Sequence, residues 1–399
     1  MTHAMRFNRA LSGVLSAVAL MAGGIGPAHA GAPVVPVAPV APVVPAASAV
    51  FPPVPTLIAH RGASALRPEH TIAAYTQAIE DGADMIEPDL VATKDGILVA
   101  RHENASAILN ADGTVREATT DIATRPEFAA LLTTKTIDGK LIRGWFTEDL
   151  TLAQLKTLRA SERIPAIRPA NVAFNGQFQV PTLQEIIDLA KSKAIEKSRT
   201  IGVYPETKHP TYFKSIGLPL ERRLVEVLAA NGWNTREAPV FIQSFEVAGL
   251  KEIRSLTTAR IVQLLSPSGR PYDFVAAGPS ELRTYADLIT PAGLREIATY
   301  ATGIGPSKDM VIPVVSGALG QPTALVAHAK AAGLVTHVYT LRPENAFLPP
   351  QLKRVPTTDN TVRGDSMTEI QTFLQAGVDG FFTDDSAVGR KAINAFMKK

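Results

Sequence analysis

Residues 84–102 read DMIEPDLVATKDGILVARH, and this stretch decides how the chain is expected to fold. Its first part, 84–92, is an apolar run typical of a buried β-strand, yet it carries Glu87 and Asp89 two residues apart. Because side chains alternate between the two faces of a strand, both carboxylates point the same way. Like charges on one face repel one another unless something positive lies between them. The pattern therefore predicts a buried strand with a positive group beside its carboxylates.

Short apolar runs alternate with amphipathic runs from Thr56 onward. Strands are expected at 56–62, 84–92, 200–208, 239–245, 260–266, 310–315, 335–341 and 380–385, and helices at 70–82, 182–194, 221–232, 323–333 and 367–377. Repeated β-then-α units predict a parallel sheet. About eight units in roughly 340 residues favour an α/β fold of the closed (β/α)₈ TIM-barrel type. An open doubly wound sheet is the alternative, although no phosphate-binding glycine loop follows any expected strand.

Two segments of distinct composition precede the expected barrel domain. Residues 1–30 carry Arg6 and Arg9 before an apolar run that closes on Ala28-His29-Ala30, which predicts a signal peptide cleaved near Ala30 and export to the periplasm or medium. Residues 31–55 are almost entirely Pro, Ala and Val and predict an extended spacer. Residues 56–399 form the expected barrel domain. Within it, the polar, turn-rich segment of about 104–181 predicts an inserted, substrate-covering subdomain between the second strand and its helix.

Composition narrows the classes of partner. The chain is 46% hydrophobic and 19% charged, with a formal net charge of +3. It has no basic run that could neutralise consecutive phosphates, which argues against a nucleic-acid partner. The N-terminal apolar run is too short for a permanent membrane span, so no stable membrane insertion is expected. The absence of cysteine excludes disulfides, thiolate metal sites and a cysteine-linked lipid anchor. The oligomeric state is not fixed by the sequence.

Polar residues gather where the apolar strands are expected to end. Barrel enzymes carry their chemistry at the carboxyl ends of the strands. Burying several polar groups together there costs free energy unless they bind one another or a common ligand. The rule selects His60, Arg61, Glu87, Asp89, His102, Glu206, Lys208, Gln243, Ser244, Asp384 and Asp385.

Three of these residues offer a set of oxygen ligands without sulfur. An all-carboxylate set from Glu87, Asp89 and Glu206 favours a hard cation, Mg²⁺ or Ca²⁺, over zinc or copper. The alternative is that the carboxylates form ion pairs with Arg61 and Lys208 and hold no metal. Proline is rare inside central strands, so Pro88 predicts that the strand has passed its last paired residue there and that the site lies at the rim.

The first expected strand ends on His60, Arg61 and Gly62. Histidine can move a proton near neutral pH, and arginine can hold a phosphate through two parallel hydrogen bonds. A lone histidine is more often a structural group, but His102 provides a second one. Cleavage of an ester needs one group that accepts a proton and one that donates it.

Four blocks, HRGASALRPEHT, EPDLVATKDGILVARHE, GVYPETK and GVDGFFTDD, resemble the glycerophosphodiester phosphodiesterase family, in particular its exported bacterial branch. The resemblance implies a phosphodiesterase barrel with His60 and His102 as the acid–base pair. It further implies Arg61 and Lys208 as phosphate contacts, and Glu87, Asp89 and Glu206 as ligands of one divalent cation, with Ca²⁺ favoured over Mg²⁺. Two positions depart from the family pattern: His70 stands where many members carry Asn, and Tyr339 where many carry Trp.

The implied reaction is hydrolysis of a small-molecule phosphodiester, such as glycerophosphocholine or glycerophosphoethanolamine, to sn-glycerol 3-phosphate and an alcohol. Attack by water and attack by the substrate's own glycerol hydroxyl, which gives a cyclic phosphate, both remain open. One alternative is a related barrel phosphodiesterase acting on intact lipids, as sphingomyelinase D and phosphatidylinositol phospholipase C do. Two others are a secreted phosphoester-binding protein without catalysis and a wall-associated structural protein.

Overall fold

Strand pairing forms a closed circuit in the structure, a computed structural model in which residues 51–398 are described. Strand β1 (Thr56–Ala59) pairs in parallel with β17 (Gly380–Thr383) on one side and with β2 (Met85–Ile86) on the other. The circuit continues through β3 (Asp89–Ala92), β9 (Gly202–Val203), β10 (Glu206–Thr207), β11 (Phe241–Ser244), β12 (Arg260–Leu265), β13 (Gly303–Pro306) and β16 (Val335–Leu341). β2 and β3 are successive parts of one strand, and so are β9 and β10. Counted in this way, eight parallel strands form the barrel. The TIM barrel is confirmed, and the open sheet is wrong.

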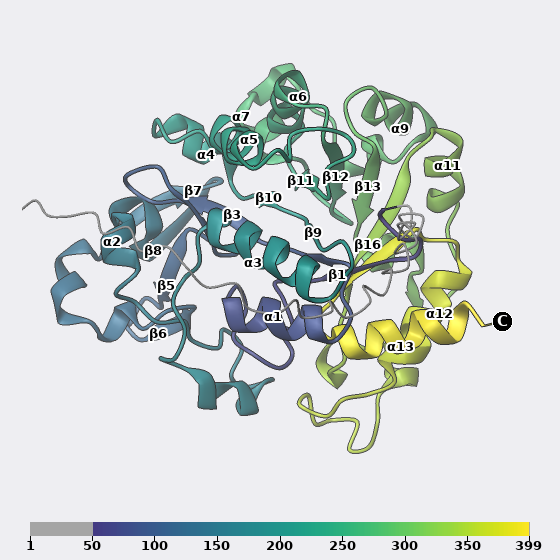
Figure 1. The fold of residues 1–399 in the computed structure, drawn as a ribbon, viewed down its shortest axis with the longest axis horizontal. Helices are drawn as coiled ribbons and strands as arrows, with labels where there is room; N and C mark the ends of the chain where they lie inside the picture. The colour runs from purple at the N-terminus through teal and green to yellow at the C-terminus, as the bar shows by residue number, and fades with distance from the viewer. Residues whose placement is uncertain (1–50, 399) are drawn as a thin grey trace, which may run out of the picture. The chain divides into compact units, whose positions relative to one another are not determined.

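Helices cover the outside of the strands (Figure 1). The longer ones are α1 (Ile72–Glu80), α3 (Leu183–Glu196), α5 (Leu220–Ala230), α6 (Val247–Leu256), α9 (Pro291–Ile297), α11 (Leu325–Ala331), α12 (Ser366–Gln375) and α13 (Ser386–Phe396). Residues at the N-termini of several of these helices cap them. Helix α3 begins with a capping box, in which the Thr182 hydroxyl accepts from the Glu185 N–H and the Glu185 carboxylate accepts from the Thr182 N–H. Its buried face, which includes Ile186 and Ile187, packs on the strands.

The barrel interior is filled by large side chains from different strands. Ile58, Met85, Tyr204, Phe241, Val262 and Phe382 form one buried cluster, separate from the larger cluster between strands and helices. The Tyr204 ring stacks on Phe241 with centroids 5.2 Å apart. This packed interior closes the barrel beneath the carboxyl ends of its strands, so the barrel is not an open pore.

One expected strand is wrong. Residues 310–315, MVIPVV, were predicted as a barrel strand, but they contain the end of the short helix α10 (Lys308–Val311) and the strand β14 (Val314–Val315), which forms a hairpin with β15 (Ala318–Leu319). The barrel strand is β13, with the sequence GIGP. A Cβ added to Gly303 would lie 2.6 Å from Val335 Cγ2, and one added to Gly305 would lie 2.6 Å from Leu264 Cδ2. Close packing requires glycine there and removes the apolar pattern that predicts strands.

Pro88 interrupts its strand and does not end it. Pairing stops after Ile86 and resumes at Asp89, which is opposite Glu206 in the parallel register. The expectation that the strand had passed its last paired residue at Pro88 is therefore wrong. The neighbouring strand is interrupted at the matching place, between β9 and β10. Backbone hydrogen bonds continue across the interruptions, because the Glu87 N–H donates to the Ala59 carbonyl at 3.1 Å and the Glu206 N–H donates to the Pro88 carbonyl at 3.0 Å. These contacts hold the acidic residues at the rim.

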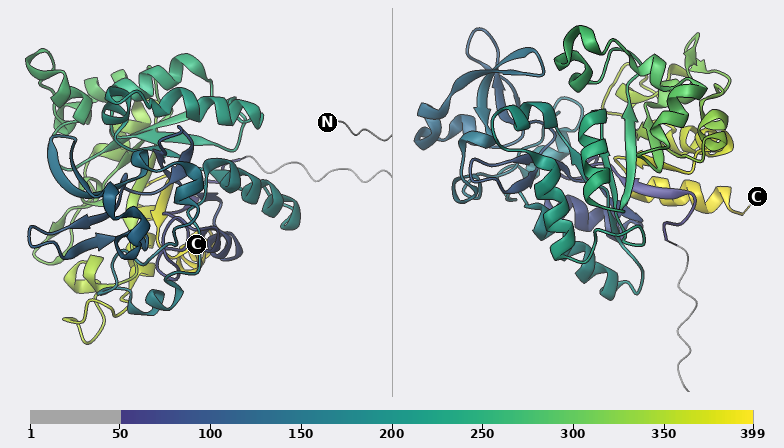
Figure 2. Two further views of the ribbon diagram at one scale, coloured as in Figure 1. Left: turned by 90° about the vertical axis from the view of Figure 1, so that its left-hand side faces the viewer. Right: turned by 90° about the horizontal axis from the view of Figure 1, so that it is seen from above.

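A second sheet lies within residues 105–146. Strands β5 (Ala105–Leu109), β6 (Val115–Ala118), β7 (Thr133–Ile137) and β8 (Lys140–Phe146) pair antiparallel in the order β6-β5-β8-β7. They lie to one side of the barrel strands in Figure 1 and in the right-hand view of Figure 2. Within residues 51–398, no helix combines the length and hydrophobicity that a membrane crossing needs. The expected signal peptide and most of the expected spacer lie outside the described residues.

Candidate active site

A cavity of about 120 Å³ opens at the carboxyl ends of the barrel strands. Six of the seven residues predicted as catalytic, substrate-binding or metal-ligating line it: His60, Arg61, Glu87, His102, Glu206 and Lys208. Phe245, Leu264, Tyr339 and Phe382 add an apolar wall. The seventh residue, Asp89, is buried beside the cavity. The structure therefore brings the predicted set together at one place.

The three predicted ligands form one acidic cluster. Glu87, Asp89 and Glu206 each offer a carboxylate oxygen, and these atoms lie within 4.8 Å of one another. All three side chains are buried. Burial, followed by the charges of Asp89 and Glu206, raises the pKa of Glu87 well above its usual value. Burial also raises the pKa of Glu206 to about 7, although Lys208 opposes it. Negative charge is therefore in excess in this cluster.

Asp89 is the best-stabilised carboxylate of the cluster. Burial alone would raise its pKa, but His70, Arg61 and Lys208 outweigh burial and hold the pKa well below its usual range. His70 Nε2 lies 3.0 Å from Asp89 Oδ2. Asp89 Oδ1 is buried and has no hydrogen-bond partner within the described residues. This oxygen is available to a ligand, as expected of a residue that holds a cation.

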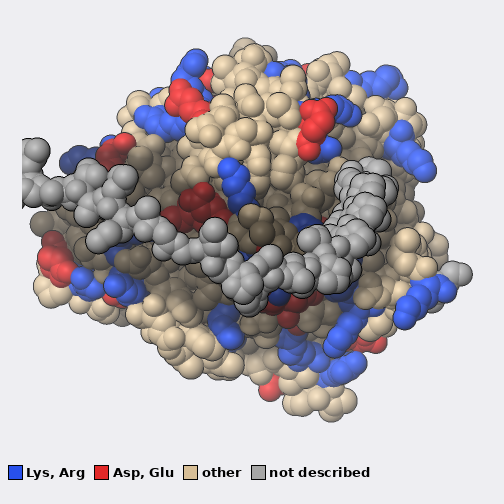
Figure 3. All heavy atoms as spheres, in the orientation of Figure 1, with Lys and Arg blue, Asp and Glu red and all other residues tan. Residues whose placement is uncertain are grey.

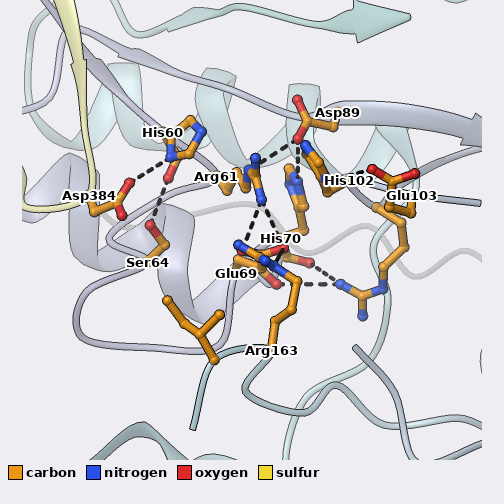
Figure 4. Close-up of polar contacts among 12 residues, drawn as sticks. His60, Arg61, Ser64, Glu69, His70, Asp89, His102, Glu103, Arg163 and Asp384 are labelled. Atoms are coloured by element: carbon orange, nitrogen blue, oxygen red, sulfur yellow. Dashed lines mark hydrogen bonds and ion pairs between the residues drawn. The ribbon is translucent and has the colours of Figure 1, made fainter. Parts of the chain in front are cut away.

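Arg61 is the positive group beside the paired carboxylates (Figure 4). Its backbone N–H donates to Glu87 Oε2 at 3.1 Å, and its Nε lies 3.2 Å from Asp89 Oδ2. Its Nη1 donates to both oxygens of Glu69 at 3.2 Å. The following Gly62 has φ +87°, and a Cβ there would lie 2.7 Å from the Ala74 carbonyl carbon. Only glycine fits this turn, which aims the Arg61 N–H at Glu87.

Both ion pairs of the metal-free alternative are present. Arg61 contacts Asp89, and Lys208 Nζ lies 3.0 Å from Glu206 Oε1. These two cations do not balance the cluster, because Arg61 is shared with Glu69 and neither side chain forms an ion pair with Glu87. Among residues 51–398, the side chain of Glu87 accepts hydrogen bonds only from the Arg61 N–H at 3.1 Å and the Gln243 side-chain amide at 2.7 Å. The residues thus fit a bound divalent cation better than they fit a closed ion-pair network.

His60 is held by a carboxylate from the last barrel strand. Asp384, just after β17, lies 2.5 Å from His60 Nδ1. Asp384 is held in turn by Arg168 and Arg342. A carboxylate at Nδ1 selects the tautomer with the proton on that nitrogen and leaves Nε2 as an acceptor. Burial and then the charge of Arg61 lower the pKa of His60 to about 4, although Asp384 opposes this.

His102, in the segment that follows β4 (Leu98–Ala100), also contacts a carboxylate through its Nδ1. Its Nδ1 lies 2.9 Å from Glu103 Oε1, so its Nε2 is likewise left as an acceptor. Partial burial, followed by the charges of Arg61 and Lys208, lowers the pKa of His102 to about 3. Glu103 Oε2 also contacts His209 Nε2 at 2.9 Å, and His209 Nδ1 contacts Asp138 Oδ2 at 2.6 Å. A chain of side chains therefore links His102 to the turn between β7 and β8.

His209 should make stability depend on pH. Burial lowers its pKa, but Asp138 and Glu103 outweigh burial and raise it to about 9. A raised histidine pKa stabilises the fold fully below the unfolded value, near pH 6.5, and this contribution is lost as pH rises through about 9. The free energy of unfolding should therefore fall by about 3 kcal/mol over this window. Urea titrations at several pH values measure this fall.

The matched comparison is between two asparagine variants. His209 has φ +51°, which asparagine tolerates, so His209→Asn preserves the backbone while removing the titrating group. In this variant, the free energy of unfolding should lose most of its dependence on pH between about 6.5 and 9. In His328→Asn, at an exposed position on α11, that dependence should be unchanged. Equal pH dependence in His209→Asn and the unchanged protein would contradict the assignment.

Sequence reasoning missed the residues that orient the site. Asp384 and Gln243 were singled out as strand-end residues without a role, and the structure places them against His60 and Glu87. Glu103 directly follows His102, a position that could have suggested a partner. Two other strand-end residues are structural, because Asp385 caps α13 and the Ser244 hydroxyl donates to the Thr207 carbonyl.

Acidic and basic side chains are interspersed on the face drawn in Figure 3, without a broad region of one sign. The acidic cluster and its two cations are buried at the rim cavity, where solvent screens their charges less than it screens charges on the surface.

Comparison with known proteins agrees with this geometry. The family model described as "Glycerophosphoryl diester phosphodiesterase family" matches residues 60–388. A glycerophosphodiester phosphodiesterase of Arabidopsis thaliana is 35% identical over 343 residues, 83% of each chain. One of Bacillus subtilis is 30% identical over 293 residues, 72% of this chain and 76% of the relative.

Solved structures show a similar fold. A glycerophosphodiester phosphodiesterase from Agrobacterium tumefaciens has a TM-score of 0.51 at 17% identity, covering 84% of this chain and 97% of that one. An Oleispira antarctica phosphodiesterase, solved with the product sn-glycerol-3-phosphate, has a TM-score of 0.52 at 19% identity and covers 86% and 97%.

Proposed function

The chain belongs to the glycerophosphoryl diester phosphodiesterase family and is a phosphodiesterase, and we propose that it hydrolyses glycerophosphodiesters, such as glycerophosphocholine and glycerophosphoethanolamine, to sn-glycerol 3-phosphate and an alcohol. One observation carries this proposal. Two carboxylate-held histidines, two cations and the acidic cluster converge on one cavity from three barrel-strand ends and the segment after β4 (Leu98–Ala100). These groups together can bind a phosphodiester, move its protons and hold a metal ion.

We propose that Glu87, Asp89 and Glu206 hold one divalent cation, Ca²⁺ in preference to Mg²⁺. The excess negative charge of the cluster and the unpartnered Asp89 oxygen support this assignment. When bound, such an ion supplies positive charge that stabilises the charge developing on phosphate oxygens. Calcium is favoured because carboxylates on separate segments suit its flexible geometry better than the strict octahedron of magnesium.

The two histidines are proposed to share the proton transfers. Each has its Nδ1 directed at a carboxylate, which leaves Nε2 as the atom that exchanges a proton with substrate. One Nε2 takes the proton of the attacking water or glycerol hydroxyl. The other imidazole, protonated at Nε2 from solvent, gives that proton to the oxygen of the departing alcohol. A bound phosphodiester anion raises the histidine pKa values, because it offsets the charges of Arg61 and Lys208 that lower them.

Arg61 and Lys208 are proposed to bind the phosphate group. Both side chains are buried and line the cavity. The Arg61 guanidinium is fixed by Glu69 and Asp89, and Lys208 is fixed by Glu206, so little side-chain freedom remains to be lost when substrate binds. Their pre-set charges act on the phosphodiester and on the charge that develops during reaction.

Three sequence-based proposals concern the rest of the chain. We propose that the segment of about 104–181, with its antiparallel sheet, covers the substrate. Activity retained after its deletion in a folded protein would contradict this role. We also propose that residues 1–30 direct export and that 31–55 act as a tether. The exported protein should begin at Gly31 by mass spectrometry, and an intact Met1 would contradict cleavage.

One assay tests the proposed function. Purified protein is incubated with a panel of glycerophosphodiesters and with the intact phospholipids of the same headgroups, with and without Ca²⁺ or Mg²⁺. Released sn-glycerol 3-phosphate is measured enzymatically. Release from the deacylated diesters is expected. Turnover of intact lipids alone would favour a lipid phosphodiesterase, and no turnover of any diester would contradict the proposal.

Glu103 is proposed as a positioning residue for His102. Glu103→Gln keeps the shape of the side chain but removes the charge that holds the His102 Nδ1 proton. We expect kcat to fall by about 10- to 100-fold, a part of the acid–base contribution, with KM changed less. Initial rates over a range of substrate concentrations separate the two constants.

Glu127→Gln is the matched control, because Glu127 is an exposed carboxylate in the same segment. It should leave both constants unchanged. A Glu103→Gln variant with unchanged kcat, or with a loss confined to KM, would contradict the positioning role. Conservative rescue by Glu103→Asp is expected to be partial, because the shorter side chain keeps the charge at a greater distance.

A further inference from the structure

A second cavity adjoins the catalytic one. It measures about 360 Å³ and shares Glu206, Lys208 and Phe245 with the smaller cavity. Its remaining wall comes from the turn between β7 and β8, the segment after β10, and the short helices α7 (Tyr272–Ala276) and α8 (Tyr285–Leu288). A phosphodiester carries a group on each side of its phosphorus. A substrate held at the shared residues therefore reaches into both cavities.

The second cavity has aromatic walls and an unpartnered hydroxyl. Phe245 and Tyr285 meet edge to face with centroids 6.3 Å apart, and Tyr272 lines the cavity near them. Tyr285 is 6% exposed, and its hydroxyl makes no hydrogen bond with the described residues but stays accessible from the cavity. An accessible phenol can donate a hydrogen bond to, or accept one from, a hydroxyl group of a bound ligand.

The charges that face the cavity are positive or neutralised. Lys140 is exposed at its mouth and Arg270 donates to the carbonyls of Arg283 and Phe274, and neither forms an ion pair within residues 51–398. Asp138 is paired with His209. Burial raises the pKa of Glu246 to about 8, against the hydrogen bond from Thr211, so this carboxyl is mostly neutral at pH 7. A cationic alcohol such as choline would find no free carboxylate to pair with.

We propose that this second cavity is the alcohol-side subsite and that it takes a polyhydroxylated alcohol without positive charge, such as glycerol or an inositol ring. The proposal rests on the proposed function, because it names which glycerophosphodiesters that same site prefers. Hydroxyl groups of the alcohol bond to the Tyr285 hydroxyl and to Lys140 Nζ, while its C–H face packs on the aromatic rings. The larger volume of this cavity admits a ring that the catalytic cavity of about 120 Å³ has no room for.

The test compares three substrates that differ only in the alcohol: glycerophosphoinositol, glycerophosphoglycerol and glycerophosphocholine. The kcat/KM values for the two polyol diesters should exceed that for the choline diester by about tenfold or more, equivalent to roughly one polar contact to a charged donor. Tyr285→Phe should lower kcat/KM for the polyol diesters by about two- to tenfold, the effect of one hydrogen bond, and leave the choline diester unchanged.

Charge reversal gives an independent variant in case Tyr285→Phe perturbs packing. Lys140→Glu should raise kcat/KM for glycerophosphocholine and lower it for both polyol diesters. Lys330→Glu, at an exposed position on α11, is the charge-matched control and should change none of them. A choline diester cleaved as well as or better than the polyol diesters, or a Lys140→Glu ratio equal to that of the control, would overturn the subsite while leaving the proposed function standing. No release of glycerol 3-phosphate from any of the three would overturn both.

Discussion

Replacing either His60 or His102 with alanine should lower kcat for glycerophosphodiester hydrolysis by about 10²- to 10⁴-fold, the usual contribution of a positioned acid or base. Each imidazole has its Nδ1 directed at a carboxylate, Asp384 or Glu103, which leaves one nitrogen for the substrate. Alanine removes that nitrogen. Release of sn-glycerol 3-phosphate at saturating substrate, measured over hours, gives the residual rate.

The loss should be catalytic and not structural. His102 side-chain atoms are 27% exposed, so truncation there leaves little buried volume unfilled. His60→Ala leaves Asp384 with Arg168 and Arg342 as partners, so its carboxylate stays compensated. Thermal unfolding should therefore remain cooperative in both variants, and His328→Ala, at an exposed position, should retain full activity. Near-normal turnover in His60→Ala or His102→Ala would end the acid–base assignment.

The barrel was predictable because seven of its eight strands are apolar runs, several of which precede an amphipathic helical pattern, and apolar runs of this length indicate buried strands. The missed strand, β13, has the sequence GIGP. Glycine is required in this strand because the side chains of Val335 and Leu264 lie too close to leave room for a Cβ. Those two residues belong to neighbouring strands that are distant in the sequence. No local pattern carries that information. The apolar run 310–315 gave a false signal, because Val314 and Val315 belong to an exposed hairpin.

The site was predictable to the extent that function sits at strand ends. His60, Glu87 and Glu206 each lie where a strand stops or breaks, and parallel strands bring their ends to one rim. The partners that orient them were harder to find. Arg168 reaches Asp384 from a segment with no strand-end signal, and Glu69 reaches Arg61 from a loop. Arg342, which also reaches Asp384, directly follows strand β16 but was not singled out. Side chains that act through others are specified by three-dimensional packing, and a single sequence does not display it.

Removing divalent cations should abolish most activity. Exhaustive dialysis against EDTA followed by metal-free buffer is expected to lower kcat by about 10²-fold or more, because a bound ion contributes several kcal/mol of charge stabilisation. The physical reason lies in the cluster itself. Without an ion, burial and then the charges of neighbouring carboxylates raise the pKa values of Glu87 and Glu206, and the positive charge of a bound ion offsets both effects. Titrating Ca²⁺ or Mg²⁺ back measures which ion restores turnover, with Ca²⁺ expected at the lower concentration.

Binding can be separated from turnover in the same protein. Isothermal titration of the dialysed protein with Ca²⁺ should show one site, and Asp89→Asn should weaken it strongly, because Asp89 supplies the one cluster oxygen that lies buried without a hydrogen-bond partner in the described structure. Asp95→Asn is the matched control, since Asp95 accepts from Thr93 and the Leu152 N–H on the surface. It should bind Ca²⁺ normally. Full activity after chelation, or equal Ca²⁺ affinity in the two variants, would show that Arg61 and Lys208 compensate the carboxylates without metal, and the site would then be a network of ion pairs.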